Sequence, residues 1–77
     1  MTIQQHAEKF GARNTAQALF RKRIASFGLF ADDLPDTCEV ADIIDSLEEA
    51  IGNDDREEVK SILSEVTLDW VGELIMS

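Results

Sequence analysis

The stretch VADIIDSLEEAI, residues 40–51, decides the fold of this chain. Its apolar side chains recur every three or four residues, which is the spacing of one face of an α-helix. Asp36 is the predicted N-cap, with Glu39 at the capping-box position, and Gly52 and Asn53 are expected to end the helix. The stretch therefore predicts an amphipathic helix whose buried face consists of Val40, Ile43, Ile44, Leu47, Ala50 and Ile51.

Helical spacing also occurs upstream of this stretch. Thr2 begins a capping box, and Gly11 is a natural stop because glycine adopts the left-handed conformation at low cost. Asn14 or Thr15 is expected to cap a second helix that runs to about Phe27. A single bent helix over the same residues is the alternative.

Downstream of residue 51 the chain predicts one further helix. Asp54 opens it, and the acidic residues of its first turn suit the positive end of a helix dipole. Its core stripe contains Val59, Ile62, Leu63, Val66, Trp70 and Leu74. Because no strand-like alternation occurs, the sequence predicts an all-α fold, a small bundle of three or four helices that forms one domain over residues 1–77.

The small size of the chain favours association. A domain of 77 residues buries only about 60% of the surface that its unfolded chain exposes. Cys38 alone cannot close a disulfide within the chain, and His6 alone cannot complete a zinc site with it. We therefore expect a homodimer or a complex with another protein. The free thiol, and the absence of an export signal or an apolar run that could cross a membrane, predict a cytoplasmic protein.

The net charge of −9 is unevenly distributed along the chain. Residues 1–30 hold five basic side chains and one acidic one, whereas residues 31–77 hold two basic and fifteen acidic ones. Either the basic helix packs against the acidic ones, or the acidic half meets a basic surface elsewhere. An acidic domain is repelled by phosphates, so binding to nucleic acid is not expected.

Two features point to a surface for another protein. One is the acidic face of the central helix, whose carboxylates could steer a basic partner. The other is a surplus of apolar side chains, because the last helix carries two apolar stripes and a small bundle cannot bury both. The candidate contacts are Phe27, Leu29, Phe30, Asp42, Asp45, Glu48, Glu49, Leu68, Trp70, Val71, Leu74 and Ile75. The sequence thus predicts a regulator or inhibitor that docks on a basic, for example nucleic-acid-binding, protein surface, as compact phage inhibitors do.

A second interpretation concerns residues 2–27. The run Ala-Glu-Lys-Phe-Gly at residues 7–11 resembles the first helix and turn of a helix-turn-helix. The resemblance implies a DNA-binding regulator whose second helix reads a groove with Arg13, Arg21, Lys22 and Arg23. His6 and Gln17 depart from the motif, because aliphatic residues are usual at these positions.

A third interpretation concerns residues 30–51, whose loop and following helix resemble those of an acyl carrier protein. The resemblance implies a phosphopantetheine attachment serine where Thr37 stands, and the glycine usual before it is absent. Ser46 lies inside the helix rather than at its start. No phosphate-binding loop, metal-ligand spacing or nucleophile motif is found, so the sequence predicts no enzyme, no metal and no cofactor.

Overall fold

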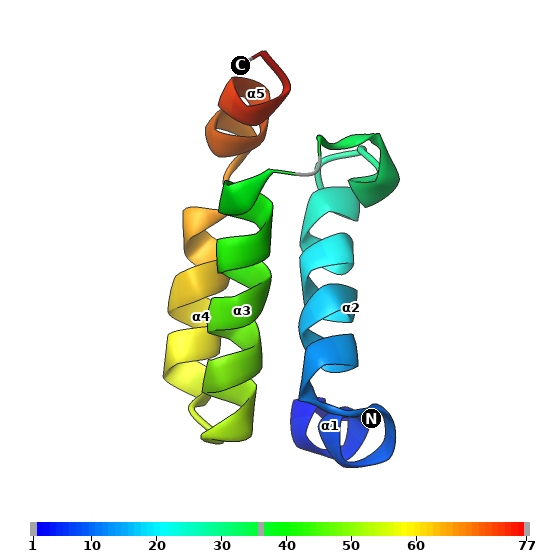
Figure 1. Ribbon diagram of the computed structural model, residues 1–77, viewed down its shortest axis with the longest axis vertical. Coiled ribbons are helices and arrows are strands. Elements are labelled where there is room, and N and C mark those ends of the chain that lie inside the picture. Colours follow the sequence, from blue (N-terminus) through cyan, green and yellow to red (C-terminus); the bar gives the residue numbers. More distant parts are fainter. Residues whose placement is uncertain (1, 36, 77) are drawn as a thin grey trace.

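The computed structural model describes residues 2–35 and 37–76, and every regular element in those residues is helical (Figure 1). The all-α prediction is confirmed, but five α-helices are present in the described ranges rather than three or four. In chain order the elements are α1 (Ile3–Phe10), α2 (Ala12–Ala25), the short 3-10 helix η1 (Ala31–Asp33), α3 (Cys38–Gly52), α4 (Arg56–Glu65) and α5 (Leu68–Met76).

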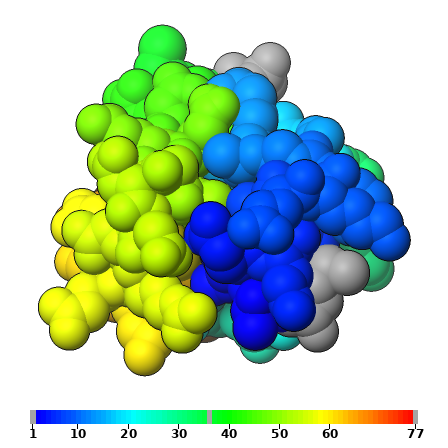
Figure 2. Space-filling view, turned by 90° about the horizontal axis from the view of Figure 1, so that it is seen from below, coloured from blue at the N-terminus to red at the C-terminus, as the bar shows by residue number. Residues whose placement is uncertain are grey.

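Three helices, α2, α3 and α4, lie side by side, and α3 packs against both of the others (Figure 1). The apolar faces that they share form the core, in which Ala16, Ile24 and Leu47 have no exposed surface. The helix α1 crosses the lower end of the bundle and reaches the turn between α3 and α4, as the view from below shows (Figure 2). Of the buried face predicted for the central helix, Leu47, Ala50 and Ile51 are buried, whereas Val40, Ile43 and Ile44 are only partly buried against the core.

The first two helices are separated by a single residue. Gly11 has φ +93°, which favours glycine, and it is both the C-cap of α1 and the N-cap of α2. The prediction that Asn14 or Thr15 caps the second helix is wrong, because α2 begins at Ala12. The tight junction gives these side chains another role. Asn14 Nδ2 donates to the carbonyl of Phe10 at 2.7 Å, and Thr15 Oγ1 donates to that of Gly11 at 3.0 Å.

The central helix begins with a threonine rather than an aspartate at its N-cap. Thr37 Oγ1 accepts a hydrogen bond from the backbone N–H of Val40 at 3.5 Å. The predicted cap, Asp36, lies outside the described residues. At the other end the backbone N–H of Asn53 donates to the carbonyl of Glu49 at 3.0 Å, and the stop predicted at Gly52 and Asn53 is confirmed.

The prediction of a single helix from Asp54 onward is wrong, because the helix is interrupted at residues 66–67, between α4 and α5. Thr67 Oγ1 accepts from the backbone N–H of Trp70 at 3.1 Å, which starts a new helix. Arg23 Nε, from α2, donates to the carbonyl of Val66 at 2.9 Å and so links α2 to the C-terminal end of α4. One straight helix cannot turn both apolar stripes inward. The break sets α5 across the upper end of the bundle, where Val71 is fully buried (Figure 1).

Candidate functional site

The acidic face of α3 has an inner edge, next to α2, that is neutralised within the chain. Arg13 Nη1 donates to Asp45 Oδ1 at 2.9 Å and lies 3.6 Å from Glu48 Oε1. The hydrogen bond to Asp45, with the charge of both carboxylates, raises the pKa of the Arg13 guanidinium above its ordinary value. Part of the charge asymmetry is therefore resolved by packing of the basic helix against the acidic one.

The outer edge of α3 carries polar side chains with no ion pair to any described residue. We define this outer edge as Glu39, Asp42, Ser46, Glu49 and Asn53, which follow one another at spacings of three and four residues and therefore share one face. All five are exposed. At a rise of about 1.5 Å per residue, the outer edge is about 21 Å long. Asp42 and Glu49 of the predicted site thus differ from Asp45 and Glu48 in having no ion pair to a described residue.

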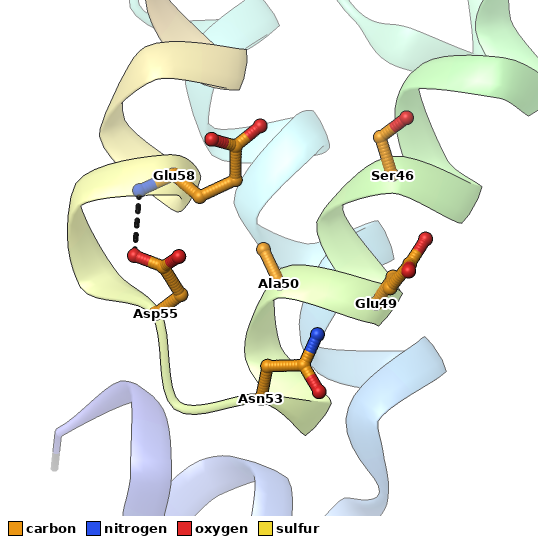
Figure 3. A pocket seen from close by; sticks show the side chains of 6 residues that line it. All are labelled: Ser46, Glu49, Ala50, Asn53, Asp55 and Glu58. Atoms are coloured by element: carbon orange, nitrogen blue, oxygen red, sulfur yellow. Dashed lines mark hydrogen bonds between the residues drawn. The ribbon is translucent and has the colours of Figure 1, made fainter.

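A hollow of about 250 Å³ lies between the lower ends of α3 and α4 (Figure 3). Glu49 on α3, and Asp55 and Glu58 at the start of α4, bring carboxylates to its rim. Asp55 is also the N-cap of α4, because its Oδ1 accepts a hydrogen bond from the backbone N–H of Glu58 at 3.1 Å. The helix start predicted at Asp54 is one residue early, because Asp55 is the N-cap of α4. The role predicted for the acidic side chains of the first turn is an interaction with the helix dipole, not the lining of a hollow. No group of three potential metal ligands occurs in the described part of the chain.

A second hollow, of about 230 Å³, lies at the upper end of the outer edge. Glu39 in the first turn of α3 lines it together with Trp70, Glu73 and Leu74 of α5. Trp70 is half-buried, and its ring meets that of Phe20 edge-on, with centroids 6.3 Å apart and an interplanar angle of 86°. The structure therefore joins two features that the sequence analysis predicted separately, the acidic face and the tryptophan of the last helix.

The predicted apolar contacts divide by burial. Val71 is fully buried and Leu74 is 6% exposed, so both belong to the interior rather than to a surface that a partner could reach. Phe27, Leu29 and Trp70 are half-buried. Apart from Phe10 of α1, which is 46% exposed, the exposed large apolar residues of the described chain belong to α5 and to the loop before η1, and both of these lie at the upper end in Figure 1. In α5 and in this loop they are Phe30 at 73%, Leu68 at 57%, Ile75 at 51% and Met76 at 87%, of which Met76 was not predicted.

The basic side chains of the helix-turn-helix interpretation are mostly engaged within the chain. Arg21 Nη2 lies 3.1 Å from Asp32 Oδ1 of η1. Arg23, bound to the Val66 carbonyl, also lies over the ring of Phe27, with its guanidinium carbon 5.0 Å from the centroid. Lys22 is exposed and makes no ion pair with the described residues. With Arg13 paired to α3, three of the four have internal partners.

The structure also places the hydroxyl, thiol and imidazole groups considered in the sequence analysis. The Thr37 hydroxyl, where a carrier serine would stand, caps α3. Cys38 is exposed at the first position of that helix. His6 is half-buried, and its Nδ1 lies 2.6 Å from Thr15 Oγ1. Among the described residues, no helix has the length and apolar character required to cross a membrane.

The comparisons with known proteins give no relatives for this chain. No family model matches it, and no curated protein and no solved structure is similar to it at a significant level.

Proposed function

We propose that the protein is a small regulator or inhibitor that binds another protein through the outer edge of α3 and the two hollows at its ends. The observation that carries this proposal is the contrast within one helix. Asp45 and Glu48 are paired with Arg13, whereas Asp42 and Glu49 have no ion pair to a described residue. Carboxylates without internal partners, aligned beside a tryptophan, suit a basic protein surface.

The electrostatics of this half of the molecule support a basic partner. Residues 38–65, which form α3 and α4, hold ten acidic side chains and two basic ones. A field of one sign accelerates association with a partner of opposite charge, and salt screens it over about 8 Å at 0.15 M. The same field repels the phosphates of nucleic acid. The partner is therefore a protein, such as one whose basic surface otherwise binds nucleic acid.

A charge-reversal pair tests the proposal directly. The ligand is a peptide of eight residues in which arginine and alanine alternate, called here the repeat peptide, and calorimetry gives its dissociation constant. We expect the double variant Asp42→Lys and Glu49→Lys to weaken binding about tenfold or more at low salt, since close charge pairs at interfaces have coupling energies above about 1.5 kcal/mol. Binding by the unchanged protein should also weaken as salt is raised.

The matched control reverses two exposed acids elsewhere. Glu8 lies on α1 and Asp33 in η1, and the double variant Glu8→Lys and Asp33→Lys changes the net charge equally. Its effect on binding should be at most about twofold, because it alters only the long-range field. Equal losses in the two double variants would reject the outer edge of α3 as the docking surface.

We also propose that the outer face of α5 pairs with a second copy of the chain. The support is the exposure of Leu68, Ile75 and Met76 on one short helix. Two copies with a charge of −9 each repel one another, so salt should strengthen this association while it weakens binding of a basic partner. Sedimentation velocity at low and high salt checks this, and a monomer under all conditions would contradict it. The variant Leu68→Gln with Ile75→Gln should abolish the dimer.

A further inference from the structure

We propose that the hollow lined by Glu39, Trp70, Glu73 and Leu74 receives an arginine side chain of the partner protein. This inference rests on the proposed function and deepens it, because it assigns one surface residue of the partner to one hollow. It concerns the upper end of the outer edge, where α5 meets the first turn of α3.

The geometry of the hollow follows from helix spacing. Glu73 and Leu74 stand three and four residues after Trp70, so the three side chains share one face of α5. Glu39, in the first turn of α3, adds a second carboxylate from a different helix. The hollow of about 230 Å³ is several times larger than the roughly 30 Å³ that a water molecule occupies in the liquid. It therefore has room for part of a long side chain.

The side chains that line the hollow suit a guanidinium group. A planar guanidinium can stack on an aromatic ring while it donates to carboxylates, which the compact ammonium of lysine does less well. The indole of Trp70 offers the ring, and Glu39 and Glu73 offer the carboxylates. Trp70 and the largely buried Leu74 also give an apolar wall for the methylene stem.

No arginine of the chain itself occupies this position among the described residues. Arg23, on α2, is committed to the Val66 carbonyl and to the ring of Phe27. Glu39 and Glu73 have no ion pair to a described residue, so both carboxylates are available. An arginine from outside the chain would complete the arrangement.

Trp70 reports on its own hollow, because it is the only tryptophan of the chain and there is no tyrosine. The experiment titrates the full chain with acetyl-Ala-Arg-Ala-amide and follows the tryptophan emission. The matched ligands carry citrulline, which has the same shape without the charge, or lysine. We expect a saturable change with the arginine peptide, a binding about threefold or more weaker with lysine, and no saturable change with citrulline.

Three variants test whether the arginine peptide binds in this hollow. Glu39→Gln and Glu73→Gln should each weaken the arginine peptide by about threefold or more, because each removes one charge pair from a partly enclosed site. Glu8→Gln, an exposed acid on α1 that does not line the hollow, should change it by less than about twofold. Denaturation curves confirm that each variant is folded. Equal responses to arginine and citrulline, or unchanged binding in both glutamate variants, would overturn the proposal.

The two proposals fail in different ways. If the small peptide gives no response while Asp42 and Glu49 still control capture of the repeat peptide, the arginine site is wrong and the proposed function stands. If neither peptide depends on these residues, both are wrong. The titration is repeated with the variant Leu68→Gln and Ile75→Gln, because dimer contact through α5 changes the surroundings of Trp70 by itself. An emission of this variant that still changes with protein concentration alone, without peptide, would assign the hollow to a second copy of the chain and overturn the arginine site.

Discussion

The two edges of α3 have the same kinds of side chain and opposite surroundings. On the inner edge, Asp45 and Glu48 meet Arg13 of α2, and their charge is used to attach one helix to another. On the outer edge, Asp42 and Glu49 have no ion pair to a described residue, and Glu49 lines the lower hollow. The acidic face of one helix can therefore hold both paired and unpaired carboxylates, because the neighbouring element decides which of them remain available to a partner.

The largest expected effect lies on the buried face of the same helix. Leu47 is fully buried between α2 and α4, and Leu47→Ala should lower the free energy of unfolding by about 3 kcal/mol, since it leaves a cavity as well as losing apolar burial. Ser46, its neighbour on the outer edge, is exposed. Ser46→Ala should change stability by less than about 0.5 kcal/mol. Chemical denaturation measures both, and similar losses would mean that the outer edge is packed against something.

A smaller effect is expected at Asp55, which both caps α4 and lines the lower hollow. Asp55→Ala should cost about 1 kcal/mol of stability because the N-cap is lost, whereas Asp55→Asn keeps a capping side chain and removes only the charge. The asparagine variant should therefore unfold like the unchanged protein and yet bind the repeat peptide about twofold more weakly. Unchanged binding in the asparagine variant would exclude the lower hollow from the docking surface.

The smallest effect is expected when the inner edge is made to resemble the outer one. Arg13→Gln removes the cation that pairs with Asp45 and Glu48. Since the pair is exposed, the denaturation midpoint should hardly move. The two released carboxylates should strengthen binding of the repeat peptide by about twofold at low salt, and this gain should disappear at high salt. Weaker binding by this variant would show that Arg13 positions the docking surface rather than neutralising its neighbours.

The helical class and the central helix could be predicted from sequence because they depend on local periodicity. The spacing of Ile43, Leu47 and Ile51 places these residues on one face whatever they pack against, and the structure buries Leu47 and Ile51 there. The stop at Gly11 is equally local, since its positive φ is a property of glycine.

The break before α5 and the division of the acidic face could not be predicted in this way, because both depend on long-range contacts. Arg13 and Asp45 are 32 residues apart, and Arg23 and Val66 are 43 apart. No local spacing identifies such pairs. Thr67 carried the one local signal for the break, as a threonine three residues before Trp70, and the apolar stripe that continues past it masked that signal.

One measurement tests the account most directly: a two-dimensional amide NMR titration of the protein with the repeat peptide. The account predicts that the shifted signals concentrate on Glu39, Asp42, Ser46 and Glu49 and on the indole N–H of Trp70, while those of α1 and η1 stay in place. Shifts spread evenly over all acidic residues, or centred on Asp45 and Glu48 at the inner edge, would contradict it.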